Sequence, residues 1–260
     1  YLGIKSSQEL FQKEFSNYKI NLFDGPHPSG NVGVQIHHVN PINSGEVVWT
    51  LKLDDIAVIG KLISTGEYLP NRTIAVTGPP VKNPKYFYLR SGAKLDSVLK
   101  KVEFDNKNIR LINGDVLSGY KVHSKGYLGH YNNKLSVLKE GNQYRLFGWI
   151  PFINNVVPSI YKTSFSWLSS NKERDYDTNL NGEERAFVAT GEMESIFPMD
   201  IYPMQLIKEC MIGDIEKMEK LGIYEVSPED FGLIDYSSSS KIEAQTIIRQ
   251  GLDHIYKETQ

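Results

Sequence analysis

A loop rich in glycine and proline is the segment whose residue types best suit ligand binding. Residues 24–33 contain three glycines, two prolines and His27, and a compact strand candidate precedes them. Such a loop can hold a phosphate when a helix begins at its end. However, the loop lacks the G-x-G-x-x-G spacing, and the residues after Gly33 alternate as in a strand. A structural turn is therefore the simpler interpretation, with a nucleotide-binding loop as the alternative.

The side chains that usually hold metals or perform catalysis are not spaced for either task. His37 and His38 are adjacent, so on a strand they face opposite sides and do not readily share a metal ion. Cys210 is the only cysteine, which excludes an intrachain disulfide, a four-cysteine zinc site and a four-cysteine iron–sulfur cluster. The G-x-S-x-G motif of a serine nucleophile is absent. We predict no catalytic residue and no metal site.

The elements that would position the loop are typical of an α/β domain. We expect a short helix over residues 7–15, strands over residues 19–23 and 47–53, and a helix from residue 56 to 63 that stops at Gly66. The alternation of Val32, Val34 and Ile36 predicts a further strand after the loop.

From residue 72 the pattern changes to short strands. We expect strands over residues 72–77, 86–89, 109–112 and 116–122, and a short helix over residues 94–101. This order predicts a small β-grasp domain.

After residue 146 the chain reads as helical. Helices are expected over residues 200–211 and 214–221, with another starting at residues 227–230. Ser240 and Glu243 have the spacing of a capping box for a last helix. Residues 146–152 form an apolar and aromatic stretch, which predicts burial between domains, with docking to a partner or a membrane surface as the alternative.

Charge is balanced overall but uneven along the chain. The 260 residues hold 29 basic and 31 acidic side chains, a net charge of −2, which argues against a general nucleic-acid binder. Residues 81–125 carry ten Lys or Arg and four Asp or Glu, whereas residues 181–230 carry four and twelve. Solvated faces explain this most simply, with a charged partner as the alternative. No stretch approaches the ~20 apolar residues of a membrane span.

Several blocks spread in order along the chain resemble the A subunit of the Na⁺-translocating NADH:quinone reductases. That protein family is related to the flavin-carrying subunit of respiratory complex I and to the RnfC-type subunit of electron-transport complexes. The blocks lie at residues 23–33, 48–49, 59–62, 81–84, 114–119, 127–129, 146–150, 181–186 and 198–203.

The resemblance implies three domains and a longer parent protein. They are the C-terminal half of a Rossmann-like α/β domain over residues 1–71, a soluble-ligand-binding β-grasp (SLBB) domain over residues 72–145 and a helical domain over residues 146–260. The chain begins at Tyr1 without Met, so we expect it to be the C-terminal portion of that protein. The glycine-rich flavin and nicotinamide loops and the cluster-binding cysteines of the related redox subunits have no counterpart here.

The resemblance further implies a role without redox chemistry in this chain. We expect a peripheral subunit on the cytoplasmic side of the bacterial inner membrane that docks to the membrane subunits or contributes to a quinone site. NADH, FAD, FMN, an iron–sulfur centre and quinone would act in other subunits, and nucleic acid is not an expected partner. The family motif places five residues in a vestigial or partner-facing cofactor loop: Asp24, Gly25, His27, Gly30 and Gly33.

An alternative of a different class is a small-ligand module without catalysis of its own. In that hypothesis the β-grasp domain and residues 24–33 form a pocket for a nucleotide, a flavin or a quinone. The basic balance of residues 81–125 favours an anionic ligand.

Overall fold

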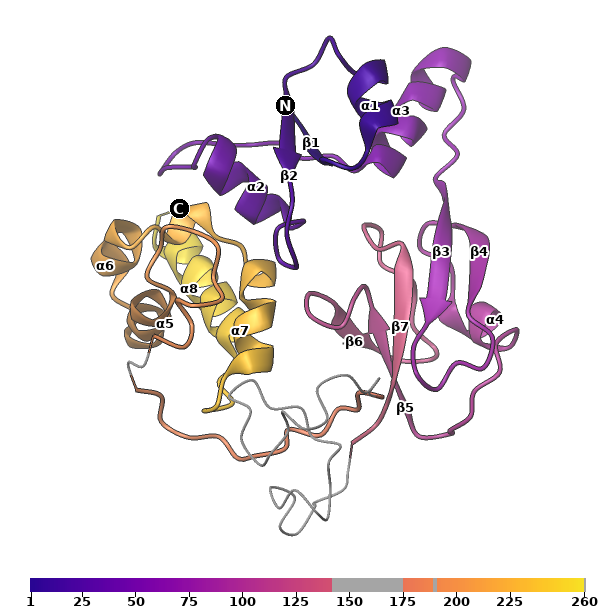
Figure 1. Ribbon diagram of the computed structural model, residues 1–260. Helices are drawn as coiled ribbons and strands as arrows, with labels where there is room; N and C mark the ends of the chain where they lie inside the picture. Colours follow the sequence, from indigo (N-terminus) through magenta and orange to yellow (C-terminus); the bar gives the residue numbers. More distant parts are fainter. Residues whose placement is uncertain (142–174, 189–190, 260) are drawn as a thin grey trace. The chain divides into compact units, whose positions relative to one another are not determined.

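The computed structural model describes residues 1–141, 175–188 and 191–259, apart from the side chains of residues 9–11, and is a mixed α/β structure (Figure 1). It contains two compact units. Unit 1 joins the two ends of the chain, Tyr1–Thr50 and Glu184–Gln260, and unit 2 is Leu51–Glu183. The apolar segment 146–152 lies outside the described residues.

The N-terminal part of unit 1 is a small β-α-β arrangement followed by a helix. Strands β1 (Leu2–Lys5) and β2 (Ile20–Phe23) pair in parallel, and helix α1 (Glu9–Glu14) connects them. Helix α2 (Val32–Val39) follows the glycine-rich loop. The predicted strand over residues 32–36 is therefore wrong. Val34 and Gly33 are buried at the start of α2, and Val34 packs in one hydrophobic cluster with residues of the C-terminal helices.

The C-terminal part of unit 1 is helical, as the sequence indicates. Its elements are α5 (Pro203–Ile212), α6 (Ile215–Lys220), two short 3₁₀ helices η2 (Ile223–Glu225) and η3 (Pro228–Phe231), α7 (Gly232–Ser237) and α8 (Ala244–Glu258). Pro203 occupies the first turn of α5, where its missing N–H costs nothing. The core of this part contains fully buried side chains, among them those of Leu206, Ile207, Met218, Phe231 and Ile248.

The start of α8 corrects one prediction. Ser240 and Glu243 do not form a capping box, because the Ser240 hydroxyl donates to the carbonyl of Ala186 instead. The Asp235 carboxylate of α7 accepts the first backbone N–H groups of α8, those of Ala244 and Gln245. A side chain outside the helix thus satisfies donors that the helix itself leaves open.

Unit 2 is built on a five-stranded sheet in the order β4-β3-β7-β5-β6 (Figure 1). The strands are β3 (Asn71–Thr77), β4 (Lys85–Arg90), β5 (Ile109–Asn113), β6 (Tyr120–Val122) and β7 (Lys134–Lys139). β3 pairs in parallel with β7, and the other pairs are antiparallel. Helix α4 (Leu95–Leu99) packs its buried Leu95 and Val98 into the core with Ile74, Leu135 and Val137.

Helix α3 (Leu53–Thr65) precedes the sheet and confirms the helix expected over residues 56–63. It ends at Gly66, which adopts a left-handed conformation with φ of 74°. A buried ion pair joins α3 to β3, since an Arg72 guanidinium nitrogen lies 2.9 Å from Asp55 Oδ1. None of the residues of α3 is buried in the described structure.

Two further strand predictions fail, one wholly and one in part. No residue of the strand expected over residues 47–53 is in a strand, since residues 47–52 pair with none in the described structure and Leu53 begins α3; the Trp49 side chain is 91 % exposed. A β-strand needs a partner for its backbone hydrogen bonds, so an apolar alternating run alone does not make one. Residues 116–119 form a turn because the Asp115 carboxylate accepts the N–H groups of Leu117 and Ser118, and β6 begins only at Tyr120.

Candidate functional site

A cavity lies at the carboxyl ends of the two parallel strands of unit 1. In parallel α/β structures ligands bind at this edge, because the loops that leave the strands meet there. The cavity has a volume of about 400 Å³. Its lining residues come from β1, the connection from β1 to α1, β2, the loop after β2 and α2: Gly3, Ile4, Lys5, Gln8, Phe23, Asp24, Gly25, His27, Ser29, Gly30 and Gln35.

The loop keeps its shape through short-range hydrogen bonds. The Ser29 hydroxyl donates to the Gly25 carbonyl at 3.0 Å, and the Asn31 N–H donates to the Pro28 carbonyl at 2.8 Å. Gly25 has φ of 126°, a conformation that residues with a Cβ rarely adopt. The His27–Pro28 peptide bond is cis. The loop so shaped contributes Asp24, Gly25, His27, Ser29 and Gly30 to the lining of one cavity.

Among the predicted site residues, His27 has a buried polar side-chain atom without a hydrogen-bond partner in the described structure. Its Nε2 is buried and has no hydrogen-bond partner among the described residues. A buried polar atom without a partner costs free energy, so a ligand that bonds to it would gain that free energy back. Lys5 and Asp24 bring opposite charges to the same lining, and Phe23 adds an aromatic surface. The cavity therefore suits a small polar molecule with an apolar part.

Gly33, the fifth predicted site residue, lies elsewhere. It is buried in the first turn of α2 and is absent from the cavity lining. A Cβ at this position would overlap the carboxylate of Asp230. Glycine is needed there because α2 approaches η3 closely, which gives Gly33 a packing role.

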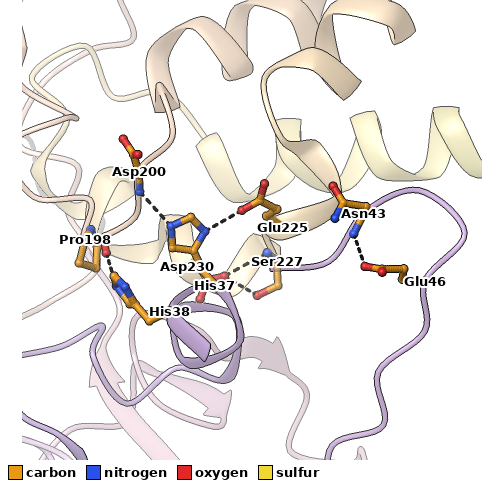
Figure 2. Close-up of polar contacts among 9 residues, drawn as sticks. All are labelled: His37, His38, Asn43, Glu46, Pro198, Asp200, Glu225, Ser227 and Asp230. Carbon is orange, nitrogen blue, oxygen red and sulfur yellow. Dashed lines mark hydrogen bonds and ion pairs between the residues drawn. The ribbon is translucent and has the colours of Figure 1, made fainter. Parts of the chain in front are cut away.

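A junction of polar contacts ties α2 to the C-terminal helices (Figure 2). His37 Nδ1 lies 2.8 Å from Glu225 Oε2, and the Asp200 N–H donates to His37 Nε2 at 3.1 Å. Because Nε2 accepts, Nδ1 carries the ring proton and donates it to Glu225. His38 Nε2 donates to the Pro198 carbonyl at 2.9 Å. Both nitrogens of His37 are thus occupied, which leaves this imidazole no free atom for acid–base chemistry or metal binding.

Asp230 completes the junction at the other end of α2. Its Oδ2 accepts from the N–H and hydroxyl of Ser227 at 3.0 and 2.9 Å, the capping box that starts η3 (Figure 2). Burial raises the pKa of this carboxyl group against the effect of those bonds. The Asn31 amide donates to the Glu229 carbonyl at 3.0 Å. Residues 227–230 therefore hold the start of α2 through Asn31 and also form the start of η3.

The loop after α2 has a local hydrogen bond of its own. The Asn43 N–H donates to Glu46 Oε2 at 2.9 Å (Figure 2). This bond fixes a turn in residues 43–46.

Among the described residues no cluster of metal ligands is found, and Cys210 is not activated as a nucleophile. Among described residues, no three His, Cys, Asp or Glu side chains gather closely enough to hold a metal ion. Burial, with the nearby Glu209 charge, raises the pKa of the Cys210 thiol to about 11. A thiol with so high a pKa is a weak nucleophile at neutral pH. In the part of the chain that the structure describes, every helix is too short or too polar to cross a membrane.

Sequence reasoning missed the junction. It considered the two adjacent histidines only for metal binding, on an expected strand. The Ser227–Asp230 spacing is the local signal that was recognisable as a helix start. The pairing of His37 with Glu225 joins residues 188 apart in sequence, and no local pattern encodes it.

Two families of known protein domains match consecutive segments in the first half of the chain. Residues 1–68 match a domain family described as "NqrA second alpha/beta domain", and residues 73–124 match one described as "NQRA C-terminal domain". Many curated proteins also match. Three of them, from three bacteria, are named as the A subunit of a Na(+)-translocating NADH-quinone reductase.

Three of these relatives illustrate the extent of the match. The protein of Hahella chejuensis is 36 % identical over 94 % of this chain and 54 % of its own length. That of Pseudomonas aeruginosa is 38 % identical over 91 % and 53 %, and that of Vibrio alginolyticus 34 % identical over 98 % and 57 %. The chain thus spans about half the length of the curated relatives it matches.

Proposed function

We propose that the chain works as part of a Na⁺-translocating NADH-quinone reductase, because it is similar to the A subunit of such reductases and its residues 1–68 and 73–124 match two domain families described for NqrA. The observation that carries the proposal is the match at 34–38 % identity over nearly the whole chain. The complex would pass electrons from NADH to ubiquinone and export Na⁺. Because the chain spans about half of its relatives, this activity is proposed for the assembled parent protein.

Within that complex the proposed role of this chain is structural, with docking to the membrane subunits or a contribution to a quinone site. Cys210 is the only cysteine, so the chain cannot supply the thiolates of an iron–sulfur cluster. The raised pKa of that thiol and the occupied nitrogens of His37 support a role without catalysis. NADH, FAD, FMN, the iron–sulfur centre and quinone would be bound by other subunits.

The domain division and location follow the same proposal. We assign residues 1–71 to the C-terminal half of a Rossmann-like domain, which the parallel β1–α1–β2 arrangement supports. Residues 72–145 would be the β-grasp domain, supported by the mixed five-stranded sheet with α4, and residues 146–260 the helical domain. The protein would lie at the cytoplasmic side of the bacterial inner membrane, bound to it through partner subunits.

Reductase assembly tests the proposal directly. The part of a relative's A subunit that this chain lacks is joined to it, and the chimera is expressed in a strain whose own A subunit is deleted. We expect Na⁺-dependent NADH:quinone reductase activity in the membranes and co-purification with the membrane subunits. The relative's intact A subunit, expressed in the same strain, shows the activity to expect when there is no junction between two proteins. Absence of co-purification with a folded chimera would refute the proposal.

The cavity beside His27 favours a second candidate function, binding of a small ligand without catalysis. The unpartnered His27 Nε2 and the cavity of about 400 Å³ support it. The volume falls within the range of small-molecule sites. A flavin, a nucleotide or a quinone combines an apolar ring with polar groups, as this lining does.

A visible spectrum distinguishes the two candidates. The purified chain is mixed with FMN, passed through a desalting column and measured for flavin absorbance; calorimetry with a nucleotide and a soluble quinone covers the other ligands. Retained flavin or a binding heat that His27→Ala abolishes and His254→Ala preserves would favour the ligand-binding function. A colourless protein with no binding heat would remove it and leave the structural role.

A further inference from the structure

Strand β4 is an open edge of the unit 2 sheet. It lies at one end of the strand order, and in the described structure it pairs with β3 alone (Figure 1). The opposite edge is β6, which has only three residues. Natural proteins protect sheet edges by keeping them short, by charged side chains, by a proline or by a bulge. β6 is short, whereas β4 has six residues, Lys85–Arg90, contains neither proline nor glycine, and carries charge only at its two ends.

The outward side chains of β4 are large and aromatic. Tyr86 is 79 % exposed and Tyr88 is 72 % exposed, while Phe87 and Leu89, the residues that follow each of them, pack against the core of the sheet. Tyrosine is enriched in protein interfaces, because one side chain offers both an apolar ring and a hydroxyl. Two neighbouring exposed tyrosines on an edge strand therefore mark a binding edge.

Charge on the strands at this edge has one sign. β3, β4 and β7 are adjacent strands and contain no Asp or Glu in their sequences. Tyr86 lies opposite Ala75, which lies opposite Lys134, so a cation follows the tyrosine in the same row across the sheet. Lys85 and Arg90 bound β4, are exposed, and form no ion pair with another described residue. The edge presents cations at both ends and nothing acidic between them.

We propose that the β4 edge binds an extended acidic segment of a partner protein, which adds to the sheet as a sixth strand. Main-chain hydrogen bonds would supply affinity and the side chains specificity, as in other strand-addition complexes. A protein strand is favoured over nucleic acid because only a strand satisfies the row of N–H and C=O groups that an edge leaves open. This surface does not depend on the reductase role.

The side-chain order of β4 defines the complementary strand. In an antiparallel partner, acidic residues would lie opposite Arg90 and Lys85, with four β-branched residues between them. The peptide Glu-Val-Thr-Val-Thr-Glu has this pattern, and Lys-Val-Thr-Val-Thr-Lys is its charge-reversed control. Directly opposite charge pairs favour pairing and like charges oppose it.

Fluorescence anisotropy with these two labelled peptides and the 260-residue chain tests the proposal. We expect the acidic peptide to bind about tenfold more tightly than the basic one at low salt, from two attractive against two repulsive pairs. Lys85→Glu with Arg90→Glu should reverse that preference. Lys107→Glu with Lys125→Glu makes the same charge change in exposed loops and should preserve it.

Backbone pairing has its own readout. Bound acidic peptide should protect the amides of residues 85–90 from hydrogen exchange, and N-methylation of alternate peptide nitrogens should abolish binding. The proposal is overturned if neither peptide binds, if both bind equally, if protection falls outside β4, or if single-stranded DNA displaces the acidic peptide. Hydrogen exchange on the unaltered chain keeps the test valid even if the double variant fails to fold.

Discussion

Helices α2 and α3 lie in the same family-matched segment, residues 1–68, yet they differ in what they bury. α2 buries Gly33 and Val34, and its two histidines bond to the C-terminal segment. α3 has an apolar stripe that includes Ile56, Ile59 and Ile63, and all three side chains are exposed in the described structure.

The difference shows that an apolar stripe predicts a helix but does not decide whether it becomes part of a core. α2 has a short, weakly patterned sequence, and its contacts with η2 and η3 make it part of unit 1. α3 is longer and better patterned, and its apolar face lacks such a partner among the described residues of unit 2. Most of the stability of a short helix comes from packing rather than propensity. Equivalent substitutions in the two helices should therefore have unequal effects.

The largest contrast is expected between the two helix glycines. Gly33→Ala should lower the free energy of unfolding by about 3 kcal/mol, because the new Cβ overlaps the buried Asp230 carboxylate that Ser227 holds in place. Gly60→Ala in α3 should raise it by about 0.5 kcal/mol, because its Cβ meets no atom within 4 Å and alanine favours the helix. Urea unfolding of both variants measures the contrast. Equal effects of the two changes would contradict close packing of α2.

Truncation of one apolar side chain in each helix should give the next largest difference. Val34→Ala removes methyl groups from the cluster that contains Phe231, at an expected cost of about 2 kcal/mol. Ile59→Ala removes more carbon from a side chain that is already 42 % exposed, and should cost less than about 1 kcal/mol. Thermal and urea denaturation report both values. A larger loss at residue 59 would mean that α3, too, is packed in the folded chain.

The hydrogen bonds of His37 should contribute less to the free energy of unfolding than the apolar contacts of α2, but the contribution should be measurable. His37→Ala removes the bonds to Glu225 and to the Asp200 N–H, at an expected cost of about 1.5 kcal/mol. His123→Ala changes an exposed histidine of unit 2 and should stay within about 0.5 kcal/mol of the unaltered protein. Unfolding followed at a single pH above the histidine range avoids differences in charge. Indistinguishable variants would argue against the junction as a stabilising contact.

The smallest effect expected is a pH dependence from Asp230. Burial raises the pKa of this carboxyl above its ordinary value of 3.8, so the folded state binds the proton more tightly than the unfolded state. Stability from this group is present below pH 3.8 and is lost as pH rises through the folded pKa.

Asp230→Asn should remove that dependence. The stability difference between the unaltered protein and the variant should fall as pH rises across this window, as measured by urea unfolding at several pH values. Asp235, whose pKa burial also raises, is present in both proteins and cancels in the difference. A difference that rises with pH would contradict the burial of Asp230.

Local patterns predicted much of the fold where the determining contacts are close in sequence. The limits of α3, α5 and β3 follow from Gly66, Pro203 and short apolar runs. β1 and β7 were not predicted, although strands as short as they are were; both are defined by pairing with strands elsewhere in the chain, β1 with β2, and β7 with β3 and β5. The cap of α8 was mispredicted for the same reason, since Asp235 lies outside that helix and its expected box.

The candidate site divides in the same way. Asp24, Gly25, His27 and Gly30 line one cavity, as expected for residues of one compact loop that follows a strand. Gly33 separates from them because α2 begins at Val32 and turns that glycine toward Asp230. The position of α2 depends on residues 198–230, which no local spacing in residues 24–39 reveals.

Residue-resolved hydrogen exchange of the intact chain under native conditions tests most directly whether α2 is packed into a core while α3 is not. If α2 is part of the core of unit 1, its amides should exchange as slowly as those of α5 and α8, whereas the amides of α3 should exchange at least about a hundredfold faster. Equal protection of α2 and α3, or faster exchange in α2, would contradict the account.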